Sequence, residues 1–305
     1  MWPSVFRVPY ARNGVDPGWR PPHAVSMNKS DQVRLAESFR ARHVRKPVLL
    51  LPNVWDGIST RLFVAAGFEA VATTSGGVAW ALGYPDGEAT PWGEVVAATA
   101  RIVRAAGAGV PVTADIEAGY GATPQAVAAH VAEIIGAGVV GINLEDGHAP
   151  MRSLEDAAAR IRASREAARA AAVPIVINAR CDLYFMPHDD EATRFAETVV
   201  RSKAYLAAGA DCLYPFGLRD PDTIARFVAA VGAPVNITGR AGMPDAAALE
   251  RLGVARITIA SAPTLVAMSA IRDLAADLHA TGRFDRLNVP LRHPDAQALF
   301  ASIKE

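Results

Sequence analysis

Cysteine is scarce in this chain, which has only Cys181 and Cys212 among its 305 residues. Both lie in segments that we expect to be strands, and two cysteines do not build the disulfide framework of a small secreted domain. We therefore expect reduced thiols in the wall of a core, and a cytoplasmic protein.

An excess of charge of one sign is also missing, because 31 basic residues balance 31 acidic residues. This balance argues against a nucleic acid or a membrane surface as the main partner. No apolar run reaches the roughly 18 residues that span a bilayer. The sequence also lacks a P-loop, a G-x-G-x-x-G unit, a zinc-like Cys/His spacing and a G-x-S-x-G elbow, so no motif supports nucleotide, zinc or serine-hydrolase chemistry.

The first 26 residues lack apolar periodicity and contain five prolines. They do not include the apolar segment of a secretory signal peptide. We expect residues 1–26 to be a disordered extension. A helix is predicted to follow from Met27, with Ser30 as its N-cap.

From residue 48 onward the chain repeats an apolar strand, a polar strand end and an amphipathic helix. The expected strands cover residues 48–52, 70–74, 110–116, 138–144, 174–179, 211–215, 234–238 and 256–260. The expected helices cover residues 59–66, 92–106, 124–136, 153–172, 190–208, 221–231 and 245–252, and another begins near 263. This alternation predicts a parallel sheet, and the count favours a closed (β/α)8 TIM barrel over an open doubly wound sheet.

The predicted barrel domain covers residues 27–285, and a helical tail covers residues 286–305. Two helices are expected after the last strand, near residues 263–281 and 293–304. Closure of the barrel does not need this much chain. We therefore expect these extra C-terminal helices to pack outside the barrel, either on their own subunit or on another one.

Polar side chains stand at the ends of the predicted strands, where the active face of such a barrel lies. Asp115 and Glu117 share a face because strand side chains alternate, Glu145 ends the next strand, and Arg180 follows on the strand after it. A hard divalent cation with an anionic substrate would use such a cluster. The alternative is a structural layer of ion pairs.

Two further strand ends belong to the same predicted mouth. Ser75, Gly76 and Gly77 follow the second strand, and a Ser-Gly-Gly turn would expose backbone N–H groups as an oxyanion cradle. Asn236 and Thr238 end the seventh strand.

Six segments together resemble the isocitrate lyase/phosphoenolpyruvate mutase superfamily, in order from about residue 48 to about residue 283. They are Leu51-Pro-Asn-Val-Trp-Asp56, Thr74-Ser-Gly-Gly77, Asp115-Ile-Glu-Ala-Gly-Tyr-Gly121, Asn143-Leu-Glu-Asp146, Asn178-Ala-Arg180 and Asn236-Ile-Thr238. The resemblance implies a barrel whose final helices swap between subunits, in a homodimer or homotetramer. It also implies a bound Mg²⁺, with Mn²⁺ as an alternative.

The resemblance assigns the metal to Asp115, with Glu117 and Glu145 reaching it partly through water, and Asp86 matches another acidic position near the metal. Ser75 and the amides of Gly76 and Gly77 would hold a carboxylate or enolate oxygen. Arg180 would clamp a substrate carboxylate, Asn236 and Thr238 would hold a distal part of the substrate, and Trp55 and Asp56 would line the mouth. Asp56 is equally suited to cap the helix that follows it.

The loop after the fourth strand departs from the family pattern. It contains no cysteine, which the isocitrate-type lyases carry there, and Gly147 stands where the phosphonate mutases have lysine. His148 is the remaining acid/base candidate, because imidazole titrates near neutral pH; the alternative is an exposed loop histidine.

The expected catalytic residues are therefore His148, Arg180 and Ser75. The expected activity is a Mg²⁺-dependent lyase that cleaves a C–C bond of a small 2-oxo or 2-hydroxy (di)carboxylate through a metal-stabilised enolate. Two alternatives stay open: a phosphonopyruvate-type P–C hydrolase or mutase, and a silent 2-oxo acid binding protein.

Overall fold

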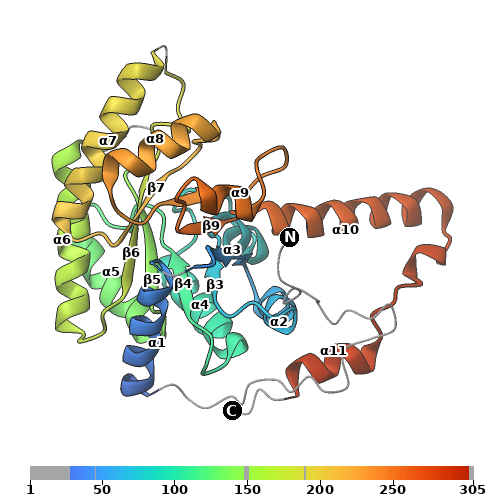
Figure 1. Cartoon of the computed structure of the whole chain (residues 1–305). Helices are drawn as coiled ribbons and strands as arrows, with labels where there is room; N and C mark the ends of the chain where they lie inside the picture. The colour runs from blue at the N-terminus through green and yellow to red at the C-terminus, as the bar shows by residue number, and fades with distance from the viewer. Residues whose placement is uncertain (1–27, 45, 148–150, 189, 302–305) are drawn as a thin grey trace.

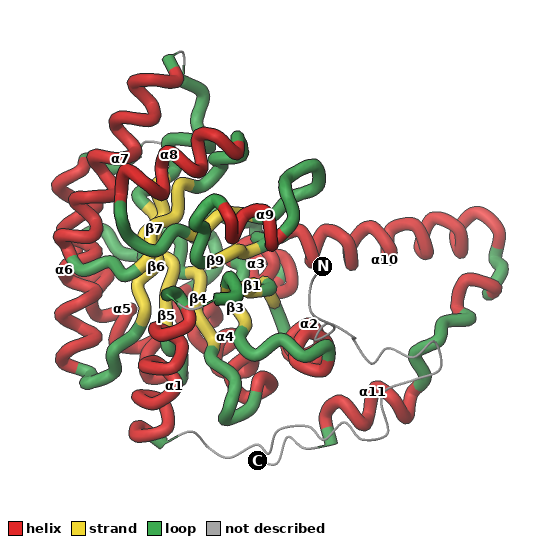
Figure 2. Tube along the Cα trace, viewed as in Figure 1, coloured by secondary structure: helices red, strands yellow, loops and turns green. Residues whose placement is uncertain are grey.

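The strands of this protein form one closed parallel barrel, seen at the centre of the molecule in Figure 2. The computed structural model describes residues 28–44, 46–147, 151–188 and 190–301. The strands are β1 (Leu49–Leu51), β2 (Asn53–Val54), β3 (Val71–Thr73), β4 (Val112–Asp115), β5 (Gly141–Glu145), β6 (Val176–Cys181), β7 (Cys212–Pro215), β8 (Asn236–Thr238) and β9 (Arg256–Thr258).

The first strand closes the barrel because its two halves pair with different neighbours. Pro52, which has no N–H to donate, separates β1 from β2. β1 pairs with β9, whereas β2 pairs with β3, and a bridge between Leu213 and Val235 connects β7 to β8. Counting β1 and β2 as one strand, the arrangement is the predicted (β/α)8 barrel.

Helices surround the barrel, as expected from the alternating sequence (Figure 1). They are α1 (Lys29–Arg42), α2 (Gly57–Ala65), α3 (Ser75–Leu82), α4 (Trp92–Ala106), α5 (Pro124–Gly136), α6 (Leu154–Ala170), α7 (Glu191–Ala208), α8 (Pro221–Val231) and α9 (Ala246–Arg251). Asp56, Thr123 and Asp220 accept N-cap hydrogen bonds from the first turns of α2, α5 and α8. Pro124 is the first residue of α5 and Pro221 the first residue of α8.

The N-cap prediction for the first helix was wrong by two residues. The side chain of Asn28, and not that of Ser30, accepts the backbone N–H of Asp31 at the start of α1. Ser30 instead lies within the helix and donates to Asn28. Asn and Ser are similarly good N-caps, so sequence preference alone does not separate these two positions.

The core fills both faces of the strands. Ile142, Ile177 and Leu213 are fully buried, as are the helix residues Ile134 and Phe227 that pack outside them. Strands covered on both faces explain the continuous apolar runs of the sequence.

The C-terminal part of the chain forms an arm outside the barrel. α10 (Ala262–Thr281) projects away from it, and after the short 3-10 helix η2 (Asp285–Leu287), α11 (His293–Phe300) returns to α2 (Figure 1). Arg61 of α2 donates from Nε to the carbonyl oxygen of Leu299 at 2.5 Å, and the Leu299 side chain is only 3% exposed.

Most of α10 is left uncovered by its own chain. Val266 is 71% exposed and Ile271 is 65% exposed, and the linker to α11 exposes Phe284 and Val289. Among the described residues, no helix is long and apolar enough to cross a membrane.

Candidate active site

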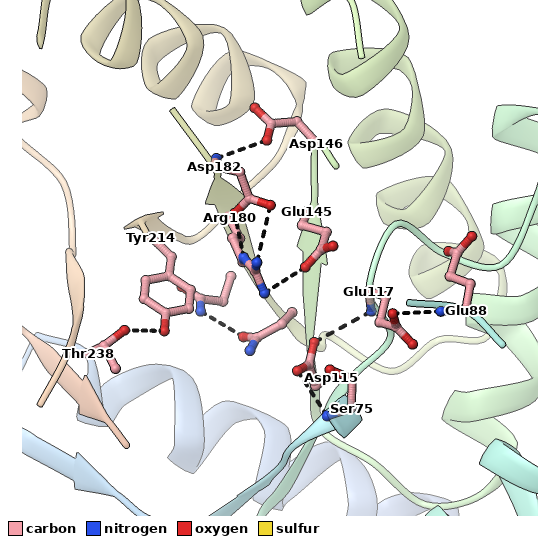
Figure 3. Close-up of polar contacts among 12 residues, drawn as sticks. Ser75, Glu88, Asp115, Glu117, Glu145, Asp146, Arg180, Asp182, Tyr214 and Thr238 are labelled. Atoms are coloured by element: carbon pink, nitrogen blue, oxygen red, sulfur yellow. Dashed lines mark hydrogen bonds and ion pairs between the residues drawn. The ribbon is translucent and has the colours of Figure 1, made fainter. Parts of the chain in front are cut away.

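The polar strand ends meet at one mouth of the barrel, because parallel strands carry their carboxyl ends to the same edge. Asp115 is the last residue of β4 and lies in register with Asn143 of β5, and Glu145 is in register with Arg180 of β6. Figure 3 shows Arg180 and Glu145 pointing toward one another, and Asp115 between Ser75 and Glu117. The structure thus brings Asp115, Glu117, Glu145 and Arg180 together, as the sequence predicted.

Arg180 is held between carboxylates rather than open to solvent. Its Nη1 lies 2.7 Å from Glu145 Oε2, and its Nε and Nη2 donate to the two oxygens of Asp182 at 2.6 and 3.1 Å. Burial opposes the charge of this 13% exposed side chain, but Glu145 and Asp182 outweigh burial and raise the pKa of Arg180. Arg180 therefore stays charged and fixes the orientation of both acids.

Asp115 faces the start of α3. The backbone N–H of Ser75 donates to Asp115 Oδ2 at 3.2 Å, and the N–H of Glu117 approaches Oδ1 at 3.4 Å. The Ser75-Gly-Gly segment, predicted as a turn, is the first turn of α3, because the apolar helix formers from Val78 to Leu82 continue it. Burial raises the pKa of Asp115, although Arg180 and the Ser75 amide partly oppose this effect.

The two glycines of α3 allow a close approach of other groups. A Cβ on Gly77 would lie 2.6 Å from Thr264 Oγ1 and 2.9 Å from the Cβ of Trp55. A Cβ on Gly76 would lie 3.0 Å from Oδ2 of Asp86, so Asp86 reaches the first turn of α3. N–H groups in the first turn of a helix have no acceptor within it. The N–H groups of the predicted oxyanion cradle therefore belong to a helix N-terminus, where they can donate to an anion.

Glu117 is locked by donors from two loops. Tyr120 donates its hydroxyl to Glu117 Oε1 at 2.5 Å, and the N–H of Glu88 donates to Oε2 at 2.8 Å. Burial raises the pKa of Glu117 to about 7, helped by the charges of Asp115 and Asp86 and opposed by the Tyr120 hydrogen bond. Sequence reasoning gave no role to Glu88, although the Tyr84-Pro-Asp-Gly-Glu88 motif contains it.

Glu145 is largely withdrawn from solvent, with a side chain that is 10% exposed. Burial raises its pKa well above the usual range, and nearby Asp182, Asp115 and Glu117 add to this effect against the charge of Arg180. Its neighbour Asp146 turns away into the barrel wall, where it accepts hydrogen bonds from the Tyr205 hydroxyl at 2.7 Å and the Asp182 N–H at 3.0 Å. Sequence reasoning missed Tyr205, which α7 carries to this acid from 59 residues away.

The residues predicted to hold the distal part of the substrate are engaged within the barrel. Asn236 is fully buried and exchanges hydrogen bonds with Thr258 at 3.1 and 3.2 Å. The hydroxyls of Thr238 and Tyr214 lie 2.5 Å apart. The assignment of Asn236 and Thr238 to substrate remains a prediction.

Trp55 and Asp56, at the end of the first predicted strand, can be placed in the structure, whereas the acid/base candidate cannot. Trp55 is partly exposed beside Gly77. Asp56 accepts the N–H of Ser59 at 2.7 Å, so the capping interpretation is confirmed. His148 lies outside the described residues.

Both cysteines are buried and free, as expected. Burial raises the pKa of each thiol, to about 12 for Cys212.

The donor set of the mouth suits a hard cation. The carboxylates of Glu145, Asp182 and Asp115 lie around the guanidinium of Arg180, and burial makes these charges costly. Among the described residues no three acidic, histidine or cysteine side chains form a ready coordination group. Mg²⁺ commonly takes one or two carboxylates and keeps several waters, so the arrangement fits a largely hydrated ion.

Comparison with known proteins places these features in a family. Residues 39–279 match the family model described as phosphoenolpyruvate phosphomutase. An uncharacterised protein of Mycobacterium tuberculosis is 35% identical over 229 residues, 74% of this chain and 83% of that protein. Oxaloacetate decarboxylase 2 of Pseudomonas fluorescens is 31% identical over 232 residues, 72% of this chain and 75% of that enzyme.

A solved structure gives the same answer for the fold. It is a Burkholderia cenocepacia J2315 protein, provisionally assigned as a phosphonomutase, with a TM-score of 0.76 and 41% identity over 80% of this chain and 99% of that one. The family match covers most of the chain and includes every strand of the barrel. The chain therefore belongs to the phosphoenolpyruvate mutase/isocitrate lyase superfamily and is an enzyme of that lyase and mutase class.

Proposed function

We propose that this protein is a Mg²⁺-dependent lyase that cleaves a C–C bond of a small 2-oxo or 2-hydroxy dicarboxylate. The observation that carries the proposal is the cluster of Asp115, Glu117 and Glu145 beside the first turn of α3. Cleavage next to a keto group leaves negative charge on an oxygen, and a bound cation and the oriented N–H groups of α3 would stabilise that charge.

Asp115 would hold the metal directly, because it lies between the start of α3 and the other acids. Glu117, Glu145 and Asp86 would reach it through water. When bound, Mg²⁺ supplies Lewis-acid stabilisation of negative charge on the substrate.

The chain's own residues would orient the substrate and control protons. Ser75 and the N–H groups of Gly76 and Gly77 would donate hydrogen bonds to a substrate carboxylate at the α3 N-terminus, where the helix dipole favours negative charge. Arg180 would hold Glu145 in place for the metal and its waters. His148 remains our candidate for the group that moves a proton at the reacting carbon.

One relative favours C–C over P–C chemistry, because oxaloacetate decarboxylase removes a carboxyl group from a 2-oxo diacid. The matching family model, phosphoenolpyruvate phosphomutase, favours the second candidate, a phosphonate hydrolase or mutase. Both would use the same mouth, so they are distinguished by substrate.

A panel assay tests the proposal. The purified protein is incubated with oxaloacetate, 2-methylisocitrate, 2,3-dimethylmalate and phosphonopyruvate, with Mg²⁺ or with EDTA, and products are quantified. We expect Mg²⁺-dependent cleavage of a diacid, lost in Asp115→Asn and retained in the exposed control Asp273→Asn. Turnover of phosphonopyruvate alone would support the second candidate. Tight ligand binding without any product would identify a silent binding protein and end the lyase proposal.

We also propose that the protein assembles as a homodimer or homotetramer. The exposed apolar side chains of α10, among them Val266 and Ile271, form a face that its own chain leaves uncovered. A second copy presents the same face, and such isologous contacts close into symmetric oligomers.

A further inference from the structure

One arginine beside the mouth, Arg240, lies within hydrogen-bonding or ion-pairing distance of no acidic side chain in the part of the chain that the structure describes. Arg240 follows β8 by two residues and is partly buried, yet among residues 28–44, 46–147, 151–188 and 190–301 its guanidinium has no recorded hydrogen bond or ion pair. Its Cζ lies 5.3 Å from the ring centroid of Phe216. Partial burial of a guanidinium is unfavourable unless an anion compensates it.

Phe216 connects this arginine to the site. The Cζ of Arg180 lies 3.8 Å from the centroid of the same ring, and Phe216 itself is almost completely buried. An aromatic ring beneath a guanidinium restricts its position while leaving the N–H groups at its edge free to bind. Arg240 therefore stands one ring away from the carboxylate cluster.

The other polar groups of this part of the mouth are already used. Arg180 is paired with Glu145 and Asp182, and Thr238 is bonded to Tyr214. Arg219 is exposed and adds a second positive charge near Arg240. Burial lowers the pKa of Arg240, and repulsion from Arg219 and Arg180 lowers it further. A negative charge placed here would relieve all three effects.

We propose that Arg240, supported by Arg219, binds the second anionic group of a dianionic substrate. The first carboxylate and the adjacent oxygen would lie at the α3 N-terminus and at the Mg²⁺ that Asp115 is proposed to hold. This inference rests on the proposed function and narrows its substrate to 2-oxo or 2-hydroxy acids with a second carboxylate beyond the reacting carbon. Arg240 thus acts as a specificity residue for the distal anionic group.

Calorimetric titration in Mg²⁺ tests this inference with two unreactive probes. Oxalate is short and reports on the metal end alone, whereas 3,3-difluorooxaloacetate adds a distal carboxylate. In Arg240→Gln we expect the dissociation constant for difluorooxaloacetate to rise about 10- to 100-fold, the effect of losing a charged hydrogen bond. The constant for oxalate should change less than about twofold, and Arg240→Lys should recover part of the loss because it keeps the charge.

Arg226→Gln is the matched control. Arg226 also lies over a phenylalanine ring, with its Cζ 4.6 Å from the centroid of Phe195, but it is exposed on α8 away from the mouth. It should leave both constants unchanged.

The outcomes separate the inference from the proposed function. If the wild type binds oxalate while Arg240→Gln binds difluorooxaloacetate normally, the inference fails and the proposed function stands. An equal loss of both probes would mean that Arg240 only supports Phe216 and Arg180, which also overturns the inference. If the wild type binds neither probe, the proposed function itself fails.

Discussion

Tyr120 and Glu117 belong to one loop, and the Tyr120 hydroxyl donates to Glu117 Oε1 over 2.5 Å. The N–H of Tyr120 donates in turn to Glu88 Oε1 at 2.6 Å, and Glu88 donates its own N–H to Glu117. These three residues are among the five non-glycine residues with positive φ in the part of the chain that the structure describes. Such conformations cost about 1–3 kcal/mol each and persist where the surroundings enforce them.

The first prediction concerns this hydrogen-bonded ring. In Tyr120→Phe, the Glu117 carboxylate loses its side-chain donor and keeps only the backbone N–H of Glu88. We therefore expect Mg²⁺ affinity to fall by about threefold or more, since a hydrogen bond contributes about 1 kcal/mol. Isothermal titration calorimetry with Mg²⁺ measures this. Tyr84→Phe is the control, because Tyr84 donates to Glu94 at 2.8 Å on the surface. Equal Mg²⁺ affinities in wild type and both variants would contradict a positioning role for Tyr120.

The second prediction concerns the charge of Arg180. In metal-free Arg180→Gln, Glu145 and Asp182 lose their shared cation, so we expect a loss of about 3–5 kcal/mol in the free energy of unfolding. Urea denaturation measures it. Arg272→Gln removes an exposed pair with Asp273 and should change stability by less than about 1 kcal/mol. A loss below 1 kcal/mol for Arg180→Gln would show that the carboxylates are well solvated instead.

The third prediction is a pH dependence at the base of the barrel. Burial, helped by the charge of Arg256, lowers the pKa of His43 to about 4. The unfolded chain, with an ordinary histidine pKa near 6.5, therefore binds the proton first. The stabilising contribution is complete above about pH 6.5 and is lost as pH falls toward 4, by up to about 3 kcal/mol.

Denaturation midpoints between pH 4.5 and 7.5 check this sign. His43→Gln should be less sensitive to acid over that range than the wild type. His279→Gln, on the exposed surface of α10, should follow the wild type. A His43→Gln variant with the acid sensitivity of the wild type would assign the effect to other groups.

The fourth prediction concerns assembly. The wild type should have the mass of a dimer or tetramer by light scattering, and the double variant Val266→Asp/Ile271→Asp should be a monomer, because charges would replace exposed apolar side chains of α10. Val44→Asp tests whether any exposed apolar residue has this effect, since Val44 is 79% exposed at the end of α1. A monomeric wild type would refute the assembly proposal.

Local sequence rules predicted much of the barrel. Alternating apolar strands and capped helices have short-range causes, so the ranges 124–136 and 221–231 match α5 and α8. The start of α1 and the turn at Ser75 were predicted incorrectly. In both cases the residues suit more than one backbone conformation, and the following segment decides between them.

The chain by itself determined which residues reach the mouth, because Asp115, Glu145 and Arg180 end neighbouring parallel strands and strand side chains alternate in direction. Only the tertiary structure decided their partners. The ion pair of Glu145 with Arg180, the contact of Glu88 with Glu117, and the position of Arg240 on Phe216 each join different loops or strands. Periodicity fixes the face on which a side chain lies, whereas the curvature of the closed barrel and the packing of its loops set the distances between such faces.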